Sequence, residues 1–177
     1  TPKSTSEVGK GTVARNAATC PVTGYTTPAK SVQRQLIERM GGASDARMYC
    51  IVSTRPRQSG RVYELPDAAQ LVAYEAARIE AGRRFNEMTN GYPVFPTEVL
   101  PAMSGVFNAP LYGHSTWASL FNARQLLAMT AYVKLARKRI AEVSDADPQF
   151  GTAFAAVLGL LIDRLADLNA SLCVWQL

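Results

Sequence analysis

The sequence predicts an α+β fold, in which a small basic head with a knuckle and a β-hairpin precedes a mainly helical body. Charge divides the chain near residue 65. Residues 1–65 hold ten Lys or Arg and four acids, a net of +6, whereas residues 66–177 hold nine bases and ten acids, a net of −1. Short β-prone runs fill the first part and helix-periodic runs the second. We therefore expect two subdomains, 1–65 and 66–177, with a long Pro- and Gly-containing loop at 89–121.

The head is expected to contain a strand, a turn, one helix and a β-hairpin. Residues 12–20 suit a short strand, and "PVTG" suits the turn after it. A helix is then predicted in "TTPAKSVQRQLIERMGG", because Thr27 suits the N-cap and Pro28 the first helical position. Two runs, "ARMYCIVST" and "RVYEL", predict a hairpin whose connection is the basic sequence "RPRQSG".

Three helices are expected in the body. The first spans residues 67–88, and its predicted buried face consists of Leu71, Tyr74, Ala81, Phe85 and Met88. The second spans residues 122–143, begins at Asn122 as N-cap, and carries Lys and Arg in its last turns. The third begins at Asp147, a cap followed by proline. Its predicted buried face consists of Phe150, Phe154, Val157, Leu161, Leu165 and Leu168.

Residues with metal-binding chemistry are few and scattered. The chain has one histidine, His114, and three cysteines, Cys20, Cys50 and Cys173, so a closed four-ligand zinc site cannot be assembled without carboxylates. The string "CPVTG" is similar to the Cys-Pro-x-Cys-Gly turn of a zinc knuckle, but Thr23 occupies the position of the second cysteine. We therefore expect a degenerate knuckle without metal. Cys50 and Cys173 lie in apolar runs and are expected to be small core residues of a protein in the reducing cytoplasm.

Motifs for catalysis are missing as well. No Gly-rich phosphate-binding loop follows a strand. "NAPLY", at residues 108–112, has the wrong spacing for the Asp- or Asn-Pro-Pro-aromatic segment with which DNA amino-methyltransferases hold their target base. No apolar run reaches the roughly 20 residues that a membrane helix needs. The chain therefore has no recognisable active site of its own.

Three strings resemble, in the same order, the middle part of large bacterial and archaeal adenine-specific DNA methylases described as containing a zinc-ribbon region. The strings are "TCPVTGYTTPAKSVQRQL", "YGHSTWASLFNARQLLAMTAYV" and "LLIDRLADLNASLCVW". The similarity covers most of residues 11–177, and its most specific part runs from Tyr112 to Leu127. A zinc ribbon requires paired Cys-x-x-Cys motifs, and this chain departs from that pattern.

The resemblance implies a fragment of a DNA adenine-N6 methyltransferase. In such proteins the S-adenosylmethionine-binding motif precedes this region and the Asp-Pro-Pro-Tyr catalytic motif follows it. The chain would be an insert between these halves that serves DNA binding or target recognition, without a cofactor of its own. DNA and the two methyltransferase halves are the implied partners. Phosphate contacts are expected from five residues of the basic head, Lys30, Arg34, Arg55, Arg57 and Arg61.

A second interpretation stays open beside the first. The alternative is a structural or protein-interaction helical scaffold without nucleic-acid binding, because runs of charge are usually only a solvated face. The absence of an initial methionine and the apolar end "SLCVWQL" agree with a fragment in either case. A third interpretation, an independent small enzyme, has no motif in its support. Salt-sensitive DNA binding would favour the first interpretation, and retention of a partner domain without DNA would favour the second.

Overall fold

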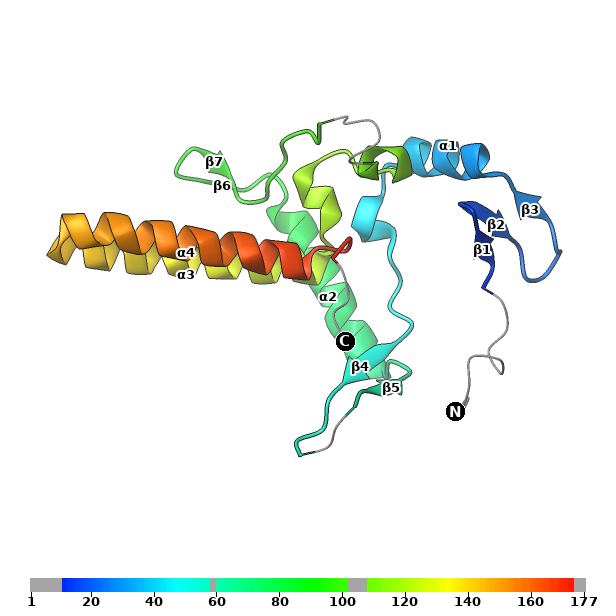
Figure 1. Ribbon diagram of the computed structural model, residues 1–177, viewed down its shortest axis with the longest axis horizontal. Helices are drawn as coiled ribbons and strands as arrows, with labels where there is room; N and C mark the ends of the chain where they lie inside the picture. The colour runs from blue at the N-terminus through cyan, green and yellow to red at the C-terminus, as the bar shows by residue number, and fades with distance from the viewer. Residues whose placement is uncertain (1–10, 58–59, 102–107, 174–177) are drawn as a thin grey trace.

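The structure is a computed structural model that describes residues 11–57, 60–101 and 108–173, and it confirms the α+β class (Figure 1). Within these residues, four α-helices and three short 3-10 helices alternate with antiparallel sheets of two or three strands. Helices α3 and α4 project from the rest as an arm, and the ribbon of β4 and β5 projects in another direction. The expected apolar end of the chain lies partly outside the described residues, which stop at 173.

The first sheet is a three-stranded antiparallel meander of β1 (Val13–Ala14), β2 (Ala17–Thr19) and β3 (Thr26–Thr27). The prediction of a single strand at 12–20 is wrong, because the chain reverses at Arg15 and Asn16. Both residues have positive φ, 49° and 64°, as the type I′ turn of a tight hairpin requires. Asparagine tolerates this conformation well, and the sequence "RN" was the available signal.

Helix α1 (Ala29–Arg39) begins one residue later than the sequence predicts. Thr27 is not its N-cap, because Thr27 pairs with Ala18 as the last residue of β3, and Pro28 takes the cap position without a side-chain hydrogen bond. The helix ends at Met40, whose left-handed conformation turns the chain into the 3-10 helix η2 (Gly42–Asp45).

Helix α2 (Ala68–Arg84) is started by a capping box. Asp67 accepts a hydrogen bond from the Gln70 backbone N–H at 2.8 Å, and the Gln70 side chain accepts from the Asp67 N–H at 2.9 Å. The predicted buried face is only partly correct. Ala81 is buried and Tyr74 half-buried, but three members are exposed because the helix packs through its small side chains and ends before residue 88: Leu71, Phe85 and Met88.

The predicted long loop supplies the centre of the core. It opens with a hairpin, β6 (Met88–Thr89) and β7 (Tyr92–Pro93), and Phe95 follows with 0 % of its surface exposed. Phe95 packs among small side chains from α2, the loop and α3: Ala81, Ala118 and Ala123. Small neighbours allow the backbones to approach a single large ring, so one aromatic residue joins three segments.

A second small cluster lies within the loop, whose 3-10 helices contact the head. Leu100 packs with Ala109 of η3 (Ala109–Tyr112) and Leu120 of η4 (Trp117–Leu120). Helix α1 packs on η3, and η2 packs on η4. These contacts cross residue 65, and the division into subdomains at that residue stays a prediction.

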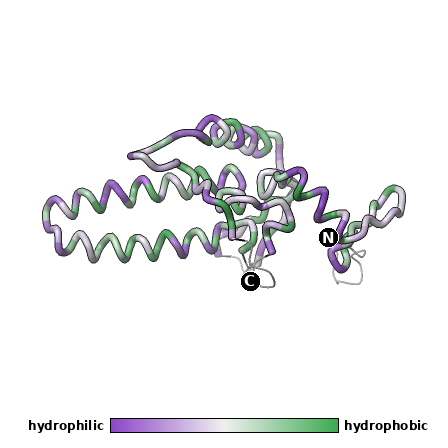
Figure 2. Tube along the Cα trace, turned by 90° about the horizontal axis from the view of Figure 1, so that it is seen from above, coloured by the Kyte–Doolittle hydropathy of each residue, from purple (hydrophilic) through white to green (hydrophobic). Residues whose placement is uncertain are grey.

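The arm consists of α3 (Ala123–Ala146) and α4 (Pro148–Asn169), joined by a single residue, Asp147. The predicted caps are confirmed. Asn122 forms a capping box at the start of α3, and the Asp147 carboxylate accepts the Phe150 N–H at 3.0 Å. Figure 2 shows the two helices side by side, with hydrophobic residues recurring along the arm. None of the described helices combines the length and the apolar character that a bilayer crossing requires.

The predicted buried face of α4 is wrong for most of its members. Phe154 and Leu165 are half-buried, whereas Val157 and Leu161 are 64 % and 52 % exposed, and Phe150 and Leu168 are exposed as well. The contact with α3 lies on a neighbouring side of α4. This side includes Gly151, which packs against Ser144 of α3. Because α4 is apolar on more than one side, its periodicity alone could not identify the packed one.

Candidate nucleic-acid interface

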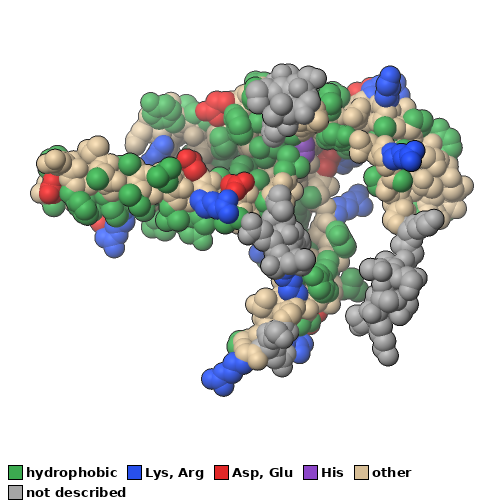
Figure 3. All heavy atoms as spheres, in the orientation of Figure 1, with side chains coloured by type: hydrophobic (Ala, Val, Ile, Leu, Met, Phe, Trp, Pro, Cys, Tyr) green, Lys and Arg blue, Asp and Glu red, His purple; other side chains and the backbone are tan. Residues whose placement is uncertain are grey.

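The β4–β5 ribbon carries three of the five predicted DNA-contacting residues. Strands β4 (Ile51–Ser53) and β5 (Val62–Glu64) are antiparallel, with Val52 opposite Tyr63, which confirms the predicted hairpin. Arg55 and Arg57 lie exposed in the connection between the strands. Figure 3 shows Lys and Arg side chains at the far end of this projecting segment.

The ribbon is basic from Arg47 to Arg61, and its one acid, Glu64, lies at the end of β5. From Arg47 to Arg61 the sequence contains no Asp or Glu. Neither Arg55 nor Arg57 forms an ion pair with another described residue, whereas Arg61 is half-buried and has a contact of its own. Cations without nearby carboxylates keep their full attraction for an anionic partner. The end of the ribbon is therefore the part of the head best suited to phosphate groups.

Exposed aromatic and apolar side chains accompany these arginines. Tyr49 is 81 % and Leu65 86 % exposed, and Tyr63 is exposed on β5. Because side chains alternate along a strand, Tyr63 and Leu65 share one face of the ribbon with Arg61. A two-stranded ribbon fits the width of the DNA major groove, and exposed tyrosines offer both a stacking surface and a hydroxyl for hydrogen bonding.

Lys30 and Arg34 do not join the ribbon. Both are exposed on α1, which lies in a different part of the molecule from β4 and β5 (Figure 1). Arg34 Nε also lies 4.0 Å from Glu38 Oε1, one turn further along the helix. The five predicted residues therefore form two separate patches, and among the residues described Arg55 and Arg57 form no ion pair whereas Arg34 lies near Glu38.

The knuckle sequence forms a tight turn between β2 and β3. The Gly24 N–H donates to the Cys20 carbonyl at 2.9 Å, and the Cys20 N–H donates to the Tyr25 carbonyl at 2.9 Å. Hydrogen bonding from the Thr23 hydroxyl, and from the Thr23 and Val22 backbone, lowers the pKa of the Cys20 thiol. No group of three or more potential metal ligands occurs among the described residues, so this turn does not fit a zinc ion.

The described residues do not fit S-adenosylmethionine either. Every strand pair formed by residues 11–57, 60–101 and 108–173 is antiparallel, and each strand has two or three residues. A nucleotide-type cofactor binds at the carboxyl ends of parallel strands, with a Gly-rich turn leading into a helix. No step of methyl transfer is therefore assigned to this chain.

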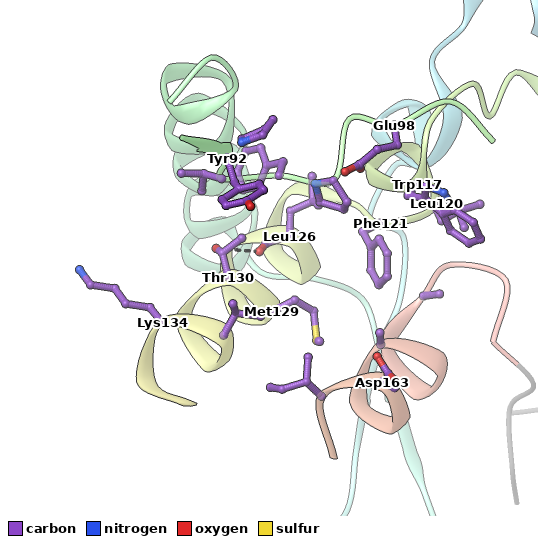
Figure 4. A pocket seen from close by; sticks show the side chains of 18 of the residues that line it. Tyr92, Glu98, Trp117, Leu120, Phe121, Leu126, Met129, Thr130, Lys134 and Asp163 are labelled. Carbon is purple, nitrogen blue, oxygen red and sulfur yellow. Dashed lines mark hydrogen bonds between the residues drawn. The ribbon is translucent and has the colours of Figure 1, made fainter. Parts of the chain in front are cut away.

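A large groove lies at the base of the arm, a feature that sequence reasoning missed. Its volume is about 1080 Å³, and its walls come from the β6–β7 hairpin, the loop after it, α3 and the end of α4. Figure 4 shows Tyr92 on one side, Met129 and Thr130 on α3, and Asp163 on α4. Apolar walls with a few charged groups at the edge suit a protein segment or an apolar ligand. The sequence signals for this groove were the apolar residues of the predicted loop and of the helix at 122–143, such as Leu126 and Val133.

His114, the single histidine, is buried rather than placed at either patch or the groove. Its ring packs near Gly42 and Ser119, between η2 and η4. Cys50 is half-buried and Cys173 is exposed, so the prediction of a core position is wrong for Cys173. Comparisons with protein-family models, curated proteins and solved structures find no match to this chain.

Proposed function

We propose that the chain binds double-stranded DNA through the β4–β5 ribbon, as a target-recognition segment of an adenine-N6 DNA methyltransferase in the cytoplasm. The observation that carries the proposal is the projecting ribbon with exposed Arg55 and Arg57 and no acid between residues 47 and 61. The resemblance of the three sequence strings to adenine-specific DNA methylases supports the methyltransferase part.

The expected chemistry of this interface is charge neutralisation followed by groove contact. Arginines at the end of the ribbon would hold phosphate oxygens on either side of a groove, and these contacts give affinity without sequence choice. Tyr63 and Leu65, on one face of the ribbon, would then meet base edges or thymine methyl groups. Sequence preference would therefore depend on the strands, and salt dependence on the loop that connects them.

The test is fluorescence anisotropy of a labelled DNA duplex across a salt series. The double variant Arg55→Ala/Arg57→Ala should weaken binding about tenfold and reduce the slope of log K against log salt by about 1.8, because two phosphate contacts are lost. The matched control, Arg78→Ala/Arg83→Ala, removes the same charge from α2, where both arginines pair with glutamates. That control should retain the slope of the unmodified protein.

A third variant, Lys30→Ala/Arg34→Ala, tests the patch on α1. If the slope of log K against log salt falls in this variant and not in the ribbon variant, DNA binds at α1 rather than at the ribbon. Absence of salt-dependent binding by the unmodified chain would overturn the proposal.

A second candidate function is a protein-interaction scaffold, and the groove at the base of the arm favours it. Val94, Leu126, Met129 and Val133 contribute apolar surface there, between charged residues at the edge. A groove of this shape suits an amphipathic helix laid along it. Co-purification of a methyltransferase half with the chain, lost in Met129→Glu and retained in Arg55→Ala/Arg57→Ala, would support the scaffold and separate it from DNA binding.

A further inference from the structure

Helix α4 has an unusual composition for a helix on the surface. From Pro148 to Ile162 it contains no charged residue, although the arm that it forms projects away from the rest of the protein (Figure 1). Five of its large apolar side chains are exposed, and all but Leu160 follow one another at intervals of seven, four and seven residues: Phe150, Val157, Leu161 and Leu168. That spacing places them in a single stripe along the helix.

This apolar stripe faces neither of the neighbours already described. The side of α4 that contacts α3 includes Gly151, and the side that lines the groove includes Ile162, Asp163 and Ala166. At 100° per residue, the stripe lies about a quarter turn from the α3 contact, on the flank opposite the groove. The same rotation of 100° per residue along α3 places two of its exposed residues, Tyr132 and Leu135, on that flank. Figure 3 shows hydrophobic side chains over the length of the arm.

We propose that a second copy of this chain covers the apolar stripe, through an antiparallel α4–α4 contact that makes a four-helix bundle of two arms. The stripe is symmetric about residue 159. In the antiparallel arrangement Val157 lies opposite Leu161 of the second copy, and Phe150 lies opposite Leu168. Each apolar residue therefore meets another one, which is the self-complementarity that a two-fold interface requires.

The distribution of charge favours a second copy over another partner. The stripe carries no charge between Pro148 and Ile162, so two copies can approach without repulsion, and a charged partner gains nothing there. The arm's cations cluster instead on α3, at Lys134, Arg137, Lys138 and Arg139. Lys134 and Arg137 line the groove on the opposite flank, whereas Arg139, seven residues after Tyr132, lies at the edge of a contact centred on α4, where Glu142 pairs with it. Phe154 would meet Arg164 of the second copy, whose guanidinium can stack on the ring.

The size of the arm is sufficient for such an interface. Helix α4 has 22 residues. At the usual rise it is about 33 Å long, and two helices side by side present a face about 20 Å wide. The area of this face, its length times its width, is of the same order as the ~800 Å² that each partner buries in a standard protein interface. The dimer does not depend on the proposed DNA binding, and either can fail alone.

Sedimentation velocity of the full chain tests the dimer. The unmodified protein should sediment as two chains of 19.2 kDa at about 100 µM, where an interface with a Kd of about 10 µM is mostly dimeric. Leu161→Glu should sediment as a monomer with unchanged helical circular dichroism. The matched control is Ile79→Glu, which places the same charge at an exposed apolar position on α2 and should remain dimeric.

A charge pair tests the antiparallel register. Val157→Lys and Leu161→Glu should each be monomeric alone, because each places a charge in the apolar contact. Mixed together they should form a heterodimer, because the ammonium introduced in one chain then faces the carboxylate introduced in the other. A monomeric unmodified protein at the same concentration, a dimer that survives Leu161→Glu, or a mixture that stays monomeric would each overturn the proposal.

Discussion

The Nδ1 atom of His114 lies 2.8 Å from the backbone oxygen of Ser119, and the histidine side chain that makes this contact is only 9 % exposed. Because a carbonyl oxygen can only accept, Nδ1 carries the proton and donates. The contact fixes the loop that leads from η3 to η4, against which η2 packs. The single histidine therefore has a structural role in the junction between the head and the body.

Replacement of this histidine should destabilise the protein. His114→Ala removes the donor and leaves the Ser119 carbonyl without its partner in a buried place, which costs about 1–3 kcal/mol. Urea unfolding followed by circular dichroism measures the change. Lys30→Ala, at an exposed position, should change stability by no more than about 0.5 kcal/mol. An equal effect of both variants would contradict the structural role of His114.

Phe95 should be the most sensitive core position. It is fully buried, and its ring lies 6.5 Å, centroid to centroid, from that of Phe85. Phe95→Ala should cost about 3–5 kcal/mol, because its alanine neighbours cannot fill the space that the ring leaves. Leu65→Ala, on the exposed face of the ribbon, should cost less than about 0.5 kcal/mol. Chemical denaturation of both variants gives the comparison, and similar midpoints would show that Phe95 is not the centre of the core.

Two glycines with nearly the same φ separate backbone strain from steric overlap. Gly113 has φ +83° and Gly91 has φ +80°, so alanine is strained at both, by about 1–2 kcal/mol. A Cβ at Gly91 meets open space, but a Cβ at Gly113 overlaps the carbonyl oxygen of Leu36 in α1. Gly113→Ala should therefore lower the melting temperature well beyond Gly91→Ala in a thermal scan. Equal losses would mean that α1 does not pack closely on Gly113.

The elements that sequence predicted well are those specified by local chemistry. Asn122 and Asp147 are followed by the residues that complete their caps, and the basic hairpin has apolar strands on both sides. The core could not be predicted in the same way. Phe95 lies in a Pro- and Gly-rich stretch without periodicity, and its neighbours Ala81 and Ala123 are distant in sequence. Small residues give no periodic signal, although they make this packing possible.

The candidate site shows the same limit. Sequence identified which residues are basic, and the ribbon arginines Arg55 and Arg57 are exposed as a binding role requires. It could not show that Lys30 and Arg34 lie apart from the ribbon, because the path of the chain between α1 and β4 is irregular and depends on contacts of η2 with η4. The periodicity of α4 likewise marked an apolar stripe but not its exposure, since α3 packs on a neighbouring side.

The reactivity of the Cys20 thiol tests its hydrogen bond with Thr23 in the turn between β2 and β3. Hydrogen bonding from Thr23 lowers the pKa of Cys20, so more thiolate is present at a given pH than in an ordinary cysteine, and alkylation should begin at lower pH. Thr23→Val removes the hydroxyl and should shift the pH profile of Cys20 alkylation upward. Peptide mass spectrometry after iodoacetamide treatment separates Cys20 from Cys50 and Cys173. An unchanged profile in Thr23→Val would show that the hydroxyl does not stabilise the thiolate.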